Sequence, residues 1–140
     1  LTSGIATAMA SHNPDIIVRP VEPKGFDDVA RSLIAGKIER NTKAAGSICD
    51  AIVTPQPGEL TFPIMKQYCG SGLVVSDEEC LKAMVIAYSR LKIVLEPGGA
   101  IALAAAIFKK ELIEGDDVIV VASGGNVDSS LFGAAVSKYS

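Results

Sequence analysis

Short runs of apolar residues alternate with helical patterns along this chain of 140 residues, an order that is typical of α/β proteins. The run at 118–122, Val-Ile-Val-Val-Ala, is rich in β-branched residues and has no polar interruption. It therefore predicts a central parallel strand that is buried on both faces. Further short strands are predicted at 16–21, 51–53, 73–75 and 93–95.

Helical patterns separate the predicted strands. Ser76 and Glu79 have the spacing of a capping box, which opens a helix with Glu78 and Lys82 paired on its outer side. The predicted inner face of this helix comprises Leu81, Met84, Val85, Tyr88 and Leu91. The run at 100–108 is apolar all round and predicts a buried helix. The other helices are predicted at 5–10 with Thr2 or Ser3 as its cap, at 28–34 ending at Gly36, at 60–68 and at 129–139.

Composition narrows the classes of function. The chain is 49% hydrophobic and only 5% aromatic, which suits helices packed on a parallel sheet in a single α/β domain over residues 1–140. A net charge of −3 offers no basic surface to a nucleic acid or an anionic membrane. No apolar run approaches the roughly 18 residues of a membrane span. Cys49, Cys69 and Cys80 lack metal-type spacing, so we expect reduced thiols in a cytoplasmic protein.

The first candidate for chemistry is a pair of glycine-bearing turns. Ser123, Gly124, Gly125 and Asn126 directly follow the predicted central strand, at the end where open α/β sheets bind small molecules. The two glycines permit a close approach of a ligand to the backbone, although an ordinary strand-to-helix turn explains the same residues. Glu96 lies beside another glycine turn at a helix start, as either a dipole-stabilised carboxylate or part of a site.

The second candidate is the acidic turn at 22–28. Glu22, Asp27 and Asp28 lie within seven residues and could supply oxygen ligands to a hard divalent cation. Acidic residues also favour the N-terminal end of a helix. Spacing alone favours this helix-capping interpretation over a cation site.

Six motifs occur in the order and spacing of one enzyme family. In sequence they are Leu-Thr-Ser-Gly-Ile-Ala at 1–6, Glu-Pro with Asp-Asp at 22–28, Pro-Gly-Glu-Leu-Thr-Phe-Pro at 57–63, Val-Ser-Asp-Glu-Glu at 75–79, Leu-Glu-Pro-Gly-Gly-Ala at 95–100 and Ser-Gly-Gly-Asn-Val-Asp at 123–128. Together they resemble the C-terminal half of the threonine/serine dehydratase and serine racemase family, which are pyridoxal-phosphate enzymes of fold type II. The resemblance covers essentially the whole chain. It implies the αβα three-layer architecture, with a mostly parallel sheet, of the large domain of those enzymes.

The resemblance implies a cofactor pocket. Ser123 matches the serine that makes a hydrogen bond at the pyridine nitrogen of pyridoxal phosphate, in a turn shared with Gly124, Gly125 and Asn126. Glu96 matches the glutamate that lines the pocket, with Gly98 in place of the usual Ser. Leu1 matches the residue after the phosphate-binding glycines, so its N–H is expected to belong to the phosphate cradle. Ala51 stands beside the cofactor ring, where the family generally has Gly.

The resemblance also implies a divalent cation such as Mg²⁺ or Ca²⁺. Its ligands would be Glu22, the backbone carbonyl of Phe26 and Asp28, and this reverses the preference that spacing alone gave to capping.

The family's Schiff-base lysine, its substrate-carboxylate loop and its tetraglycine loop find no match in this chain. The sequence is therefore expected to be a half-enzyme, the C-terminal portion of a dehydratase that converts a small hydroxy amino acid to a 2-oxo acid and ammonia. Racemase-like activity, or an inactive α/β binding module that keeps the fold, are the alternatives. The expected partner is a second copy in a homodimer or a complementing N-terminal fragment.

Overall fold

The computed structural model describes all 140 residues, and the chain divides into two compact units. The first unit comprises residues 1–44 and 54–74, and the second comprises residues 45–53 and 75–140. The prediction of a single domain stays a prediction. None of the helices combines the length and the hydropathy that crossing a membrane would need.

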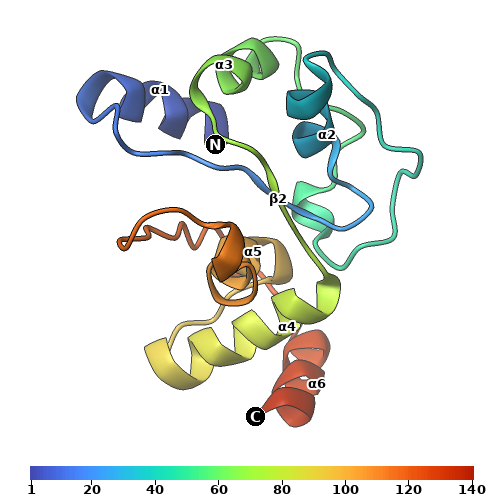
Figure 1. Cartoon of the computed structure of the whole chain (residues 1–140). Coiled ribbons are helices and arrows are strands. Elements are labelled where there is room, and N and C mark those ends of the chain that lie inside the picture. Colours follow the sequence, from blue (N-terminus) through green and yellow to red (C-terminus); the bar gives the residue numbers. More distant parts are fainter. The chain divides into compact units, whose positions relative to one another are not determined.

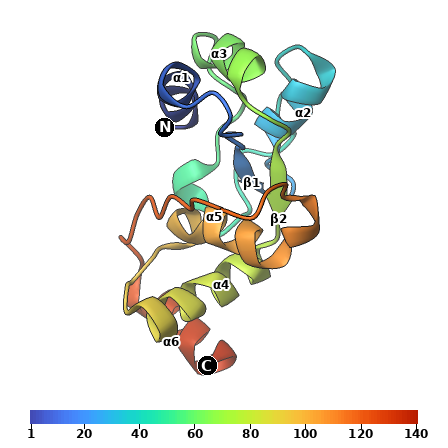
Figure 2. The same ribbon diagram turned by 60° about the vertical axis from the view of Figure 1, so that its left-hand side comes forward.

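The first unit contains three α-helices and the strands of a small sheet (Figures 1 and 2). Strand β1 pairs with strand β2, which ends at the unit boundary, and a parallel bridge joins Val18 to Cys69. Helix α1 packs against α3, while α2 contacts both β1 and α3. The bounds are α1 Thr2–His12, β1 Val21–Pro23, α2 Asp28–Ala35, α3 Thr61–Tyr68 and β2 Leu73–Val75.

In the second unit, α4 lies between α5 and α6 (Figures 1 and 2). Helix α5 is apolar on almost every side, and its first turns from Pro97 to Ile101 are fully buried, as predicted. Tyr88 contacts Phe132 of α6 edge to face, with ring centroids 5.3 Å apart. The bounds are η1 Asp50–Ile52, α4 Asp77–Ile86, η2 Ala87–Leu91, α5 Pro97–Phe108, η3 Lys110–Leu112 and α6 Ser129–Tyr139.

The predicted strands are only partly correct. Of the run at 16–21, only Val18 and Val21 form sheet contacts, while residues 51–53 lie largely in the 3₁₀ turn η1. Residues 93–95 and 118–122 form no strand, and the prediction of a buried central strand at 118–122 is wrong, since the side chain of Ile119 is 83% exposed. A strand requires a neighbour that pairs with its N–H and C=O groups, and the only sheet of the chain, formed by β1 and β2, includes neither segment.

The helix predictions are mostly confirmed, with two instructive errors. Helix α1 begins at Thr2 after Leu1 and has no side-chain cap, so Thr2 or Ser3 as a cap is wrong. Leu91 is 58% exposed because α4 continues into the π-helical turn η2, whose wider turn rotates later residues away from the predicted face. The left-handed Lys92 then ends that turn.

The capping box at the start of α4 also connects two helices. The Ser76 hydroxyl accepts a hydrogen bond from the Glu79 N–H, and Glu79 Oε2 accepts one from the Ser76 N–H at 2.7 Å. The other oxygen of Glu79 accepts a 2.7 Å bond from Lys109 Nζ, just after α5. Burial acts to raise the pKa of Glu79, but the bonds from Lys109 and Ser76 outweigh it and lower that pKa.

Replacing Glu79 therefore removes two contacts at once. We expect Glu79→Ala to lower the free energy of unfolding by about 1–2 kcal/mol at neutral pH, measured by urea denaturation. A lowered pKa means that the carboxylate stabilises the fold above the ordinary glutamate range and loses this effect as pH falls through the lowered value. The difference from the native chain should shrink accordingly in acid.

The neighbouring Glu78→Ala is the matched control. Glu78 makes an exposed i,i+4 pair with Lys82 at 3.0 Å, so its loss should cost at most about 0.5 kcal/mol. Equal effects of the two substitutions would contradict the bridging role of Glu79.

Candidate functional site

The Ser123–Asn126 turn meets the start of α5 within the second unit. The Glu96 N–H donates a hydrogen bond of 3.1 Å to the Gly124 carbonyl. The Val127 N–H donates one of 2.9 Å to the Gly125 carbonyl, which closes the turn before Asp128 caps α6. The structure thus brings together Glu96 and the Ser-Gly-Gly-Asn segment, which the family resemblance assigns to one pocket.

Three glycines permit this backbone contact. A Cβ atom at Gly99 would overlap the Gly124 carbonyl oxygen, and one at Gly124 would overlap Glu96 Oε1. At Gly125, a Cβ atom would lie 2.7 Å from the Val94 carbonyl oxygen. At Gly99 and Gly125 the clashing atoms belong to the backbone, so no side chain fits there unless the main chain moves, whereas at Gly124 the side chain of Glu96 would have to move.

The turn η1 forms another wall of the same region. A Cβ atom at Gly98 would lie 3.5 Å from two side-chain carbons of Ile52 and 3.8 Å from Ala51 Cβ, which is ordinary van der Waals contact. Ala51 therefore lies near the start of α5, next to the Glu96 segment. The predicted Ala51, Glu96 and 123–126 positions share one region, whereas Leu1 belongs to the other unit and its predicted role stays a prediction.

This region presents polar groups that the rest of the chain does not use. Ser123 and Asn126 are exposed, and no other side chain of the chain occupies their hydrogen-bonding groups. A hydroxyl can donate to or accept from a ring nitrogen, and an amide can do both at once. The region therefore offers free hydrogen-bonding groups to a small molecule.

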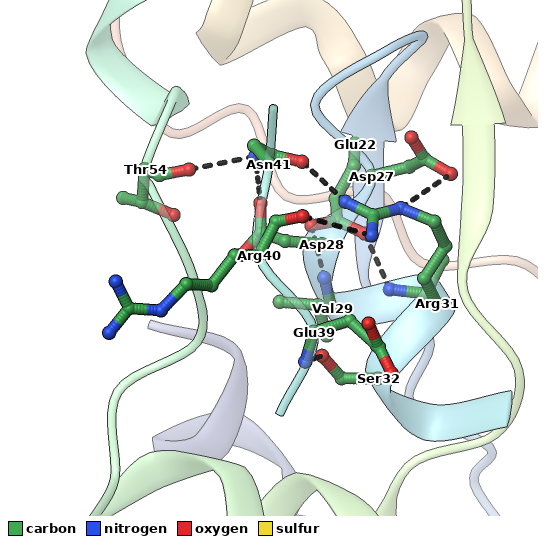
Figure 3. Close-up of polar contacts among 11 residues, drawn as sticks. Glu22, Asp27, Asp28, Val29, Arg31, Ser32, Glu39, Arg40, Asn41 and Thr54 are labelled. Carbon is green, nitrogen blue, oxygen red and sulfur yellow. Dashed lines mark hydrogen bonds and ion pairs between the residues drawn. The ribbon is translucent and has the colours of Figure 1, made fainter. Parts of the chain in front are cut away.

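The acidic turn of the first unit is built around a long-range helix cap (Figure 3). Glu22, on β1, accepts hydrogen bonds from the Val29 N–H at 2.8 Å and the Ala30 N–H at 2.7 Å, at the start of α2. Asp27 precedes α2 but makes no side-chain cap. The capping interpretation is thus correct in kind, although Glu22 rather than Asp27 or Asp28 supplies the cap.

Asp28 is almost entirely buried beside this cap. Its Oδ1 accepts a 2.6 Å bond from the Asn41 side chain, which also donates to the Thr54 carbonyl and accepts from Arg31 (Figure 3). Its Oδ2 is buried without a hydrogen-bond partner. An unpaired buried carboxylate oxygen is costly, so Asp28 has an unused ligand atom.

Burial changes the protonation of both carboxyl groups. Desolvation raises the pKa of Glu22 to about 7, against the two amide bonds and aided by the nearby Asp28 and Asp27. Desolvation also raises the pKa of Asp28, against the bond from Asn41. The structure groups no three Asp, Glu, His or Cys side chains in a way that could hold a metal ion. A cation here would need backbone or water oxygens as well.

Sequence reasoning missed Asn41 and Gly99. Asn41 lies in the aperiodic segment 37–50, and no local pattern links it to Asp28 across the intervening helix. Gly99 belongs to the Leu-Glu-Pro-Gly-Gly-Ala motif at 95–100, but its role depends on the Gly124 carbonyl, which only the folded chain brings near.

Comparison with known proteins identifies similar enzymes. The model of the family described as pyridoxal-phosphate dependent enzyme matches residues 1–124. A serine racemase of Dictyostelium discoideum is 40% identical over 134 residues, which are 93% of this chain and 41% of that protein. An L-threonine ammonia-lyase of Thermotoga maritima is 32% identical over 138 residues, 99% of this chain and 34% of that one. The chain thus spans about two-fifths or less of the length of these relatives.

Solved structures show the same relation. A threonine deaminase from T.th. superposes with a TM-score of 0.87 at 38% identity, covering 91% of this chain and 43% of that one. A maize serine racemase gives a TM-score of 0.81 at 35% identity, and the match covers 98% of this chain and 43% of that one. The likeness confirms the predicted α/β fold class. With a family model that matches most of its residues, the chain belongs to the pyridoxal-phosphate-dependent enzymes.

Proposed function

We propose that this chain forms part of the cofactor pocket of a hydroxy-amino-acid dehydratase, which in its complete form converts threonine or serine to a 2-oxo acid and ammonia. The observation that carries the proposal is the contact between the Ser123–Asn126 turn and the Glu96–Gly99 segment. The similarity of the chain to an L-threonine ammonia-lyase and a threonine deaminase supports the reaction class.

Each residue of the region has a distinct task in this proposal. When bound, pyridoxal phosphate supplies an electron sink for bonds at the α-carbon of an amino acid. Ser123 would hydrogen-bond the pyridine nitrogen, and a hydroxyl does not keep that nitrogen protonated as a carboxylate would. A weaker electron sink favours rapid β-elimination over a long-lived carbanion. Glu96 and Ala51 would line the ring, and Gly124 and Gly125 would bring the backbone close to it.

We propose that a complementing segment of the same enzyme completes the site. Residues 118–121, together with Ile93 and Val94, are apolar, largely exposed and outside any strand, and Val94 is 48% exposed. Such segments offer exposed apolar side chains to an incoming strand. The length of the relatives beyond the part that this chain spans supports this occupant over a second copy.

A complementation assay tests both proposals. The chain is co-purified with the part of the Thermotoga relative that it does not span, and 2-oxo acid formation from threonine and serine is followed with added pyridoxal phosphate. Turnover only with both pieces supports the proposed function. A folded pair without turnover supports the inactive binding module instead, and self-association of the chain alone would favour a second copy as the partner.

Ser123 gives the sharpest mutational test. In the complemented enzyme, we expect Ser123→Ala to lower kcat about tenfold, the equivalent of one hydrogen bond to the reacting system. The cofactor absorbance should also shift, because the ring nitrogen loses its partner. Ser137→Ala, on the exposed side of α6, is the matched control and should leave both unchanged. A Ser123→Ala enzyme with native rate and spectrum would refute the assigned contact.

Racemisation is the second candidate, and the 40% identity to a serine racemase favours it. Chiral chromatography of the same reaction separates the two: D-serine without 2-oxo acid indicates a racemase, whereas 2-oxo acid and ammonia indicate a dehydratase.

We also propose that Glu22, the Phe26 carbonyl and Asp28 bind a divalent cation such as Mg²⁺ or Ca²⁺. The buried Asp28 Oδ2 supports the proposal, because this oxygen has no hydrogen-bond partner and is available as a ligand atom. Each Glu22 oxygen keeps a second lone pair while it caps α2. Oxygen ligands completed by water are what both cations prefer.

The pH dependence of stability tests this cation site. Without metal, a Glu22 pKa raised to about 7 favours the protonated group, so the contribution of Glu22 to stability is greatest below about pH 4.5 and falls by up to about 3 kcal/mol as pH rises through 7. We expect Glu22→Gln to flatten this slope in chelator, and Glu59→Gln, an exposed carboxyl of the same unit, to retain it.

Millimolar Mg²⁺ or Ca²⁺ should stabilise the native chain at pH 7 and leave Glu22→Gln unaffected, as measured by Tm. Equal stabilisation of both proteins would place the cation elsewhere.

A further inference from the structure

Two buried thiols lie side by side in the second unit. The Sγ atoms of Cys49 and Cys80 are 3.6 Å apart, although the residues are 31 positions apart in the chain. Both residues are wholly buried and free. Cys49 immediately precedes η1, and Cys80 lies near the start of α4. The pair therefore bridges two elements that the sequence does not connect locally.

The backbones that carry the thiols are fixed by other contacts. Asp77, the first residue of α4, accepts a 2.6 Å bond from the Ser47 hydroxyl and a 3.2 Å bond from the Ile48 N–H. The Cys49 N–H in turn donates to the Ser47 hydroxyl at 3.1 Å. The hydrogen bonds of Asp77 and Ser47 thus hold the two sulfur atoms near each other without a disulfide.

The two thiols differ in reactivity. The neighbouring Cys80 thiol, and then Ser47, lower the pKa of Cys49 against the effect of burial. The pKa of Cys80 is raised by the contact with Cys49 and by burial. Cys49 is therefore the nucleophile of the pair, since the thiolate is the reactive form. No third Asp, Glu, His or Cys side chain joins them as a metal ligand.

We propose that Cys49 and Cys80 form a reversible disulfide when the protein meets a peroxide. A disulfide requires sulfur atoms about 2 Å apart, so the two atoms need to approach by about 1.5 Å, a distance that small side-chain rotations cover. Hydrogen peroxide reaches such buried thiols through local opening of the structure, which makes the oxidation slow. The inference does not depend on the proposed function, because it concerns a bond within this chain.

The reaction is balanced in two steps. The Cys49 thiolate attacks one oxygen of the peroxide, breaks the O–O bond and becomes a sulfenic acid, and the hydroxide released takes up the proton lost by the thiol. The Cys80 thiol then attacks the sulfenic sulfur, and a second water leaves with its proton. The two thiols are together oxidised by two electrons, and one peroxide is reduced to two waters.

The bond would act beside the candidate cofactor region. It would fix η1, which carries Ala51 and Ile52 against Gly98, to the first turn of α4. Closing this long loop restricts the unfolded chain, so the oxidised protein should be more resistant to heat than the reduced one.

Peptide mapping tests the proposal directly. The intact protein is treated with excess hydrogen peroxide, remaining thiols are blocked under denaturing conditions, and the protein is digested with trypsin and then with a protease that cleaves after glutamate. The second cleavage is essential, because Cys69 and Cys80 share one tryptic peptide. Glu78 and Glu79 are the only glutamates between the two cysteines, so cleavage after them separates Cys69 from Cys80. We expect a Cys49–Cys80 cross-linked peptide that thiol reductant removes, with Cys69 blocked.

Matched variants complete the test. Cys69→Ser should form the cross-link as the native protein does, and its oxidised form should show the same rise in Tm of several degrees. Cys49→Ser and Cys80→Ser should form none, and their circular dichroism reports whether they fold. Higher sulfur oxides on Cys49 without a cross-link, or a cross-link that uses Cys69, would overturn the proposal, and mapping of the native protein decides even where a variant does not fold.

Discussion

The second unit depends on one main-chain contact, that between the Gly124 carbonyl and the start of α5. The Glu96 N–H donates to this carbonyl, and Gly99 has no Cβ that would displace it. The contact places the Ser123 turn beside Glu96, so that a hydroxyl, a carboxylate and several bare peptide groups occupy one region. The buried first turns of α5 make that region rigid, because α5 cannot shift without disturbing its packing on α4.

The first unit relies on a different device, a carboxylate that caps a helix from a neighbouring strand. Glu22 satisfies two of the free N–H groups of α2 but loses much of its hydration in doing so, and its pKa rises as a result. Asp28 and Asn41 extend the polar cluster and leave one carboxylate oxygen unused. The same arrangement thus stabilises α2 and supplies oxygen atoms of the kind that hard cations bind.

The parts of the fold that local sequence could predict are those with local causes. The Ser76 capping box, the end of α2 at a left-handed Gly36 and the apolar α5 all follow from neighbouring residues, and the structure confirms them. The predicted strand at 118–122 failed because a strand depends on a partner, which no periodicity reveals.

The candidate site shows the same division between local and long-range causes. Motif spacing identified Glu96 and the Ser123 turn, and the structure brings them together. The cap from Glu22, the link from Asn41 to Asp28 and the Cys49–Cys80 pair join residues far apart in sequence, so only the folded chain could show them. The π-helical turn η2 likewise depends on packing rather than on a pattern of residues.

Hydrogen–deuterium exchange of the complemented protein, with and without pyridoxal phosphate, tests the central claim most directly. Because the Glu96 and Ser123 segments form one region, the cofactor should slow exchange of the amides of Glu96, Gly98 and Gly99 together with those at 123–127, with little change in α6 beyond its first turn. Protection of one segment without the other, or protection confined to other parts of the chain, would contradict a shared cofactor site.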